Sequence, residues 1–130
     1  MDKRVAVIMP CYNSMPYLVE AIESILKQTF WNFDLIAIDD ASTDKSLETL
    51  GKFALLDSRI KIYPNRYGHG CKNARNYGID ICKDKYEYIA IMDSDDVAPI
   101  NRLQIEVAFL DENKDIGAVA GNARVISESG

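Results

Sequence analysis

Four short apolar runs alternate along this chain with four segments whose apolar residues recur at helical spacing. The runs cover residues 5–9, 33–38, 60–63 and 86–92. Because they are short, continuous and rich in β-branched side chains, they predict strands that are buried on both faces. Strands and helices that alternate in this way form α/β domains in which helices cover a mostly parallel sheet. The pattern therefore predicts a layered α/β domain.

The segments between and after these runs predict four helices and one further strand. Helical spacing places the helices near residues 18–26, 47–54, 74–81 and 99–110, and residues 117–126 predict a fifth strand. Asn13 or Ser14 is a suitable cap for the first helix, and Pro16 suits its first turn. At 130 residues, without repeats or a linker, the chain is one domain by size.

Charge and cysteine usage narrow the range of partners. The net charge of −5 argues against nucleic acid and anionic membrane surfaces, because both are themselves negative. Cys11, Cys71 and Cys82 follow no metal-binding spacing, which indicates a reducing, cytoplasmic location. The sequence has no signal peptide and no apolar stretch of about 20 residues. Peripheral membrane association through segments outside these residues stays open.

Polar residues follow three of the four predicted strands at the point where each strand ends. Residues 11–13 follow the first strand, Asp39 and Asp40 follow the second, and residues 93–96 follow the fourth. Parallel strands end at one edge of a sheet, and α/β domains bind their ligands at that edge. Three polar strand ends at one edge favour a binding site over three independent solvated loops.

Three carboxylates lie within residues 93–96. Like charges this close repel one another, so a cation is expected among them. Mg²⁺ or Mn²⁺ holding a diphosphate would fit, because hard cations take carboxylate and phosphate oxygens. The structural alternative is a solvated turn, in which Asp93 and Ser94 shape the turn and Asp95 or Asp96 caps the next helix.

Five segments stand in the order and spacing of a known family: VIMPCYN (7–13), ILKQTF (25–30), IDDASTD (38–44), ARNYG (74–78) and MDSDD (92–96). Together they resemble the inverting family-2 glycosyltransferases, over residues 5–126. The resemblance implies a GT-A fold, which is a Rossmann-like, three-layer α/β/α sandwich with a mostly parallel sheet. It also implies that residues 1–130 are the nucleotide-sugar-binding part of a glycosyltransferase domain, truncated before the acceptor-binding half.

The resemblance implies roles at the nucleotide end of the site. Asp40 resembles the carboxylate that pairs with the donor base, most often with N3–H of uracil, while guanosine and thymidine stay open. A buried acceptor discriminates between bases because a wrong base leaves it unpaired. Asp39 is expected to accept backbone N–H groups of its own loop. Pro10 and Tyr12 resemble the wall beside base and ribose, with core packing as the alternative for Tyr12.

Residues 93–95 resemble the D-x-D motif of the family. By this resemblance Asp95 would ligate the metal directly, and Asp93 would reach the ribose hydroxyls or, through water, the metal. Asp96 would support these two or cap a helix. The metal would neutralise the diphosphate and stabilise it as the leaving group.

Two basic residues precede or begin the third predicted helix. Arg75 resembles the family arginine near the nucleotide, and the alternative is a salt bridge to Asp39 or Asp93. His69 stands where the family has a small or apolar residue. A lone histidine in a loop is usually solvated, so it receives no chemical role.

The predicted function is transfer of a sugar from a nucleotide-diphospho-sugar, UDP-sugars first, to a hydroxyl of a saccharide or lipid-linked acceptor, with inversion and metal assistance. No residue matches the catalytic base of the family, so we expect the base beyond Gly130 and an isolated chain that is inactive. A non-catalytic nucleotide-sugar-binding or interaction module is the alternative. Receiver domains and D-x-D phosphatases place acidic residues after the first strand, where this chain has Pro10, Cys11 and Tyr12.

Overall fold

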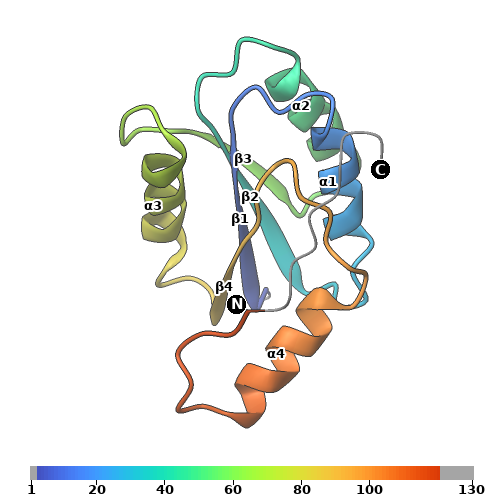
Figure 1. Ribbon diagram of the computed structural model, residues 1–130, viewed down its shortest axis with the longest axis vertical. Helices are drawn as coiled ribbons and strands as arrows, with labels where there is room; N and C mark the ends of the chain where they lie inside the picture. The colour runs from blue at the N-terminus through green and yellow to red at the C-terminus, as the bar shows by residue number, and fades with distance from the viewer. Residues whose placement is uncertain (1–2, 121–130) are drawn as a thin grey trace.

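The protein alternates strands and helices as the sequence predicts (Figure 1), in a computed structural model that describes residues 3–120. All four expected helices and the first four expected strands occur within that range. In chain order the elements are β1 (Val5–Cys11), α1 (Leu18–Leu26), β2 (Phe33–Asp39), α2 (Ser46–Leu56), β3 (Ile60–Pro64), α3 (Cys71–Cys82), β4 (Tyr88–Ile91) and α4 (Arg102–Glu112).

The strands form one parallel sheet in the order β3-β2-β1-β4. β1 lies in the middle, with Val7 beside Leu35 of β2 and Ala90 of β4. The chain adds β2 and β3 on one side of β1 and then crosses back to add β4 on the other. The carboxyl ends of β1 and β4 therefore form the topological switch point, where open α/β sheets bind ligands.

Helices cover both faces of the sheet (Figure 1). α1, α2 and α4 pack on the face to which Val7 and Met9 point, and α3 packs on the opposite face, beside Ile8. Successive side chains of a strand point to opposite faces, so a strand covered on both sides is apolar throughout. All seven residues of β1 are buried. The predicted three-layer α/β/α fold is confirmed, and the described sheet is entirely parallel.

α3 approaches the sheet most closely at Gly78. A Cβ atom at this position would lie 2.6 Å from Cγ2 of Ile8 and 3.3 Å from Cγ1 of Ile38. No side-chain carbon fits at that distance without movement of the neighbours, so a glycine is needed here. The close packing fixes where the first turn of α3 lies relative to the ends of β1 and β2.

The residues before the first helix do not act as its caps. α1 begins at Leu18 without a side-chain cap, so the predicted capping by Asn13 or Ser14 is wrong, and Pro16 precedes the helix. The backbone N–H groups of Tyr17 and Leu18 instead donate to the carbonyl of Ser14. The side chains of Asn13 and Ser14 bond to other loops, and this places them in the site described below.

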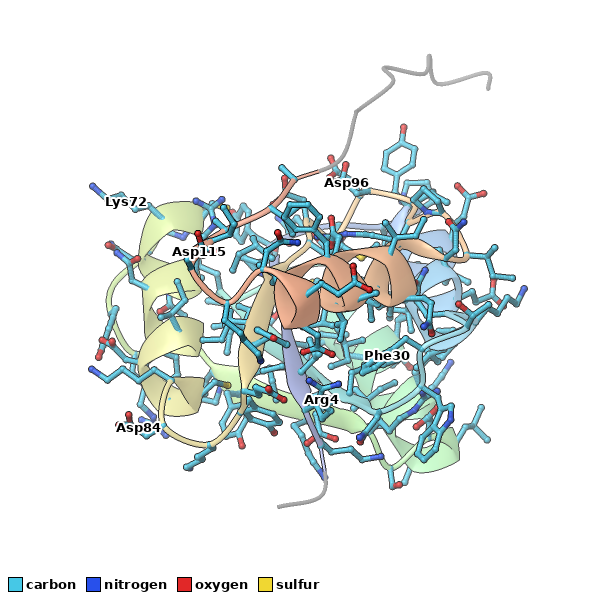
Figure 2. All side chains as sticks on the ribbon, turned by 90° about the horizontal axis from the view of Figure 1, so that it is seen from below. Arg4, Phe30, Lys72, Asp84, Asp96 and Asp115 are labelled. Atoms are coloured by element: carbon cyan, nitrogen blue, oxygen red, sulfur yellow. The ribbon has the colours of Figure 1, made fainter. Side chains whose placement is uncertain are left out.

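An ionic cluster fastens α4 to the start of β1, close to the labelled Arg4 in Figure 2. Arg4 donates to Oε1 of Glu87 at 2.6 Å and to Oδ1 of Asp111 at 2.7 Å. The hydroxyl of Tyr88 donates to the same oxygen of Asp111 at 2.7 Å. The hydrogen bonds from Arg4, and then from Tyr88, lower the pKa of Asp111 to about 2. This cluster anchors the helix that follows the acidic loop.

The fourth strand is shorter than its apolar run. Pairing with β1 begins where the N–H groups of Glu87 and Tyr88 both donate to the carbonyl of Arg4, so Tyr86 precedes the strand. Residues 117–120 have no regular secondary structure, and the rest of the predicted fifth strand, 121–126, lies outside the described residues. Among residues 3–120, no helix is long and apolar enough to cross a membrane.

Candidate functional site

A cavity of about 510 Å³ opens at the switch point between β1 and β4. Its volume lies within the range of small-molecule sites, about 300–1,000 Å³. Five of the six predicted site residues line it together, and Arg75 does not. The lining residues are Pro10, Cys11, Tyr12, Asn13, Ser14, Met15, Tyr17, Asp40, His69, Gly70, Cys71, Ala74, Asp93, Ser94 and Asp95.

Asp40 is a buried carboxylate at one end of this cavity, and it is only 6% exposed. Its Oδ1 accepts a hydrogen bond from Nδ2 of Asn65 at 2.9 Å. Its Oδ2 accepts from the N–H of Gly70 at 2.8 Å and lies 2.8 Å from Nδ1 of His69. Burial by itself raises the pKa of Asp40, but the bonds from Asn65 and Gly70 and the contact with His69 outweigh it, and the pKa falls below its ordinary value. Asp40 is therefore an ionised acceptor, and a carboxylate with about four lone-pair sites keeps one on Oδ1 for a ligand.

Tyr12 is an exposed wall of the cavity. Its side chain is 50% exposed, so the alternative of core packing is wrong. The ring of His69 meets the ring of Tyr12 edge-on, with 4.9 Å between the centroids. Pro10 lies in β1, paired with Ile38 of the neighbouring strand, and it lines the same cavity.

Two loops are tied together beside Tyr12. Oδ1 of Asn13 accepts the backbone N–H of Thr43 at 2.7 Å and that of Asp44 at 3.2 Å. Asp39 accepts the N–H and the hydroxyl of Ser42, at 3.3 and 2.7 Å, so its predicted role within the loop is confirmed. The loops after β1 and β2 therefore hold each other in place at the edge of the cavity.

The acidic loop supplies the other end of the site. One carboxylate oxygen from each of Asp93, Asp95 and Asp96 lies within 4.8 Å of the others, and all three side chains are exposed. Partial desolvation, together with the charges of Asp93 and Asp95, raises the pKa of Asp96 above its ordinary value. α4 begins at Arg102 without a side-chain cap, so neither Asp95 nor Asp96 caps it. Clustered carboxylate oxygens of this kind suit a hard divalent cation.

Ser94 turns inward between two of these carboxylates. It is buried, and its hydroxyl is hydrogen-bonded to the hydroxyl of Ser14. The N–H of Ser14 in turn donates to Oγ of Ser46 at 2.8 Å, at the start of α2. With Ser94 held inside, Asp93 and Asp95 on either side of it both remain exposed at the cavity.

Arg75 lies one residue beyond the cavity lining, in the first turns of α3. Its Nη2 donates to Sγ of Cys71 at 3.4 Å, and Cys71 does line the cavity. Among residues 3–120, no ion pair joins Arg75 to Asp39 or Asp93, so the salt-bridge alternative is not observed. The Nε of Arg75 is buried and has no hydrogen-bond partner among the described residues.

Two residues of the site, Asn65 and His69, were not assigned to it from the sequence. Both lie in the loop between β3 and α3: Asn65 donates to Oδ1 of Asp40, and Nδ1 of His69 lies 2.8 Å from its Oδ2. Asn65 directly follows Pro64 at the end of β3, and this fourth polar strand end was a signal that could have identified it. His69 stands between Gly68 and Gly70, but two glycines indicate only that the loop turns sharply.

Comparison with known proteins adds independent information. The family model for glycosyl transferase family 2 matches residues 6–130. Glycosyltransferase GlyG of Streptococcus pneumoniae is 39% identical over 99% of this chain and 42% of its own length. The UDP-Glc:alpha-D-GlcNAc-diphosphoundecaprenol beta-1,3-glucosyltransferase WfgD of Escherichia coli is 34% identical over 98% of this chain and 49% of its own. The chain therefore spans less than half the length of these two relatives.

Solved structures agree with this result. TarS 1-349 of S. aureus in complex with UDP has a TM-score of 0.75 and 30% identity, over 85% of this chain and 33% of its own. Its complex with UDP-GlcNAc gives a TM-score of 0.73. A mannosyltransferase of Pyrobaculum calidifontis, with a TM-score of 0.74 and 24% identity, shares the fold. Because the family model covers nearly the whole chain and the fold and the cavity agree with it, this chain belongs to glycosyl transferase family 2.

Proposed function

We propose that this chain is the donor-binding part of an inverting glycosyltransferase that uses a UDP-sugar with the help of a divalent metal ion. One observation carries the proposal: Asp40 and Asp95, from loops more than fifty residues apart, line the same cavity at the switch point. The cavity has a buried carboxylate, Asp40, at one end and clustered exposed carboxylates at the other. A nucleoside diphosphate presents matching features, a base N–H at one end and a metal-binding diphosphate at the other.

The base end suits a base that carries a ring N–H, and the solved relatives favour uridine among these. Asp40 keeps one lone pair for a donor such as N3–H of uracil, with Pro10 and Tyr12 beside the base and ribose. The solved complexes of TarS with UDP and with UDP-GlcNAc, at 30% identity, support the same donor class here. Arg75 would serve the nucleotide from the edge of the site, since its buried Nε lacks a partner among the described residues.

The diphosphate end favours Mg²⁺ or Mn²⁺. Asp95 and Asp93 would hold the ion, and Asp96 lies close enough to complete a set of three carboxylate oxygens. Such an ion would neutralise the diphosphate and stabilise it as the leaving group when the sugar bond breaks. Partial burial, together with the negative charges of Asp93 and Asp95, raises the pKa of Asp96, and a bound cation would relieve the repulsion among these carboxylates.

The acceptor and the catalytic base complete the proposal. A hydroxyl of a saccharide or lipid-linked acceptor would attack the anomeric carbon, its proton would pass to a carboxylate beyond Gly130, and the nucleoside diphosphate would leave from the opposite side. WfgD is named for a diphosphoundecaprenol-linked acceptor, which supports the lipid-linked class. We place the reaction in the cytoplasm, where Cys11, Cys71 and Cys82 would remain reduced, and their free thiols are in keeping with this location.

Calorimetric titration of UDP, with and without Mn²⁺, tests the proposal on the wild type, Asp95→Asn and a control, Asp84→Asn. Asp84 is an exposed carboxylate in the turn after α3, far from the labelled Asp96 in Figure 2. We expect Mn²⁺ to strengthen UDP binding in the wild type and in Asp84→Asn, and to have little effect in Asp95→Asn. If Mn²⁺ changes binding equally in all three proteins, or in none, the metal assignment fails.

A further inference from the structure

His69 is held over the buried carboxylate of Asp40 by the shape of its loop. Gly68 has a φ of 89° and Gly70 a φ of 131°, and residues other than glycine rarely adopt such backbone angles. These two turns bring the loop back over the end of β2. As a result Nδ1 of His69 and the N–H of Gly70 both lie 2.8 Å from the same oxygen, Oδ2 of Asp40.

This contact determines what Asp40 can recognise. A carboxylate that accepts hydrogen bonds from Asn65 and Gly70, with Nδ1 of His69 at 2.8 Å, is held in one orientation and stays ionised, so it can only accept. Uracil, thymine and guanine present a ring N–H to such an acceptor. Cytosine and adenine present a ring nitrogen lone pair at the corresponding position, which an ionised carboxylate repels.

His69 also reaches the wall of the cavity. Its ring meets Tyr12 edge-on at 4.9 Å between centroids, and both residues line the cavity together with Asp40. The side chain is 68% exposed, in contrast to 8% for that of Asp40. His69 is thus an exposed residue that links the buried acceptor to the exposed wall, and its replacement is tolerated far better than replacement of a core residue.

We propose that His69 is a positioning residue for base selection: by donating Nδ1–H to Asp40 it holds that carboxylate as a fixed acceptor, so that the site selects nucleoside diphosphates whose base carries a ring N–H and rejects those whose base offers a lone pair. This inference rests on the proposed function, because it requires a nucleotide base beside Asp40. His69 acts through Asp40 and takes no part in the bond-breaking step.

Two variants separate the hydrogen bond from the ring. His69→Asn keeps an N–H donor close to the position of Nδ1 and loses the ring, whereas His69→Phe keeps the ring beside Tyr12 and loses the donor. UDP and CDP are titrated calorimetrically into the wild type and both variants in the presence of Mn²⁺, after thermal unfolding has confirmed that each variant folds. The readout is the ratio of the UDP and CDP dissociation constants.

We expect the wild type to prefer UDP over CDP by about tenfold or more, the effect of one well-placed polar contact. His69→Phe should weaken UDP binding by about tenfold and leave CDP binding nearly unchanged, so that the UDP and CDP dissociation constants become more similar. His69→Asn should retain the preference to within about threefold.

The outcomes distinguish this inference from the function on which it rests. If the wild type binds neither UDP nor CDP, the proposed function and the inference both fail. If the wild type prefers UDP and His69→Phe keeps the same preference, only the inference fails. It also fails if the two variants lose UDP and CDP binding equally, because the histidine would then act as general support for the loop.

Discussion

Replacing Gly78 by alanine tests how tightly α3 packs on the sheet. The added Cβ would lie 2.6 Å from Cγ2 of Ile8, and this isoleucine is fully buried, so it cannot move into solvent to relieve the contact. Overpacking of a filled core costs about 1–3 kcal/mol. Alanine recovers up to about 1 kcal/mol of helix propensity. Because the contact is so short, we expect an overpacking cost near the upper end of about 1–3 kcal/mol. After the gain in helix propensity, the free energy of unfolding should fall by about 1–2 kcal/mol.

Gly51 provides a matched control in another helix. It lies within α2, and a Cβ atom added there would meet nothing within 4 Å. Gly51→Ala should therefore show only the helix-propensity gain and stabilise the protein by about 0.5–1 kcal/mol. The same chemical change is thus expected to have opposite signs at Gly51 and Gly78.

Urea unfolding followed by circular dichroism measures both variants, and calorimetry with UDP adds a functional readout. Gly78→Ala should also weaken UDP binding, because α3 contributes Cys71 and Ala74 to the cavity and would be pushed away from the sheet. If Gly78→Ala stabilises the protein as much as Gly51→Ala does, the helix and the sheet are not in close contact and the reasoning is refuted.

Two further predictions concern Asp40 and the thiols. Asp40→Asn should weaken UDP binding by about 1–3 kcal/mol in calorimetric titrations, and a change within error would mean that Asp40 does not read the base. Folding lowers the pKa of Asp40, so its contribution to stability should be complete above the ordinary carboxyl pKa and disappear as the pH falls through the lowered value. The difference in the free energy of unfolding between wild type and Asp40→Asn, measured by urea unfolding, should therefore be smaller at acidic than at neutral pH. Burial raises the pKa of Cys11 and raises that of Cys82 to about 11, so a disulfide reagent at about pH 8 should modify the exposed Cys71 first. UDP with Mn²⁺ should slow that modification, and rapid reaction of all three thiols would contradict the described burial.

The candidate site was largely predictable because its residues follow strands. A short apolar run that stops at a polar residue marks a strand end, and the ends of parallel strands meet at one edge whatever their order. This local pattern indicated residues 11–13, 39–40 and 93–96, and the family resemblance then singled out Tyr12, Asp40, Asp93 and Asp95 among them, which do line one cavity. The resemblance also pointed to Arg75, which lies one residue beyond the lining because its direction depends on the rotation of α3 about its own axis.

Errors arose where a polar side chain had more than one possible partner. Asn13 has the chemistry of a helix cap, but its amide oxygen bonds to the backbone of Thr43 and Asp44, about thirty residues away in sequence. His69 is largely exposed, as expected of a loop histidine, but its loop, with positive φ angles at Gly68 and Gly70, also brings it into contact with Asp40, which the sequence did not indicate. The neighbouring sequence does not distinguish these possibilities, because the competing hydrogen-bond partners are chemically similar. Only the fold determines which of them lies within reach.

The sequence by itself determined the class of fold, the extent of most strands and helices and the chemical character of the site, because hydrophobic periodicity and strand-end chemistry act over a few residues. Tertiary structure alone decided the strand order β3-β2-β1-β4, which puts the acidic loop beside the end of β1 instead of beside β3. It also decided the contacts to Asp40 from Asn65, His69 and Gly70. Those features depend on how the helices pack on the sheet, and that packing is determined by many contacts between residues far apart in the chain.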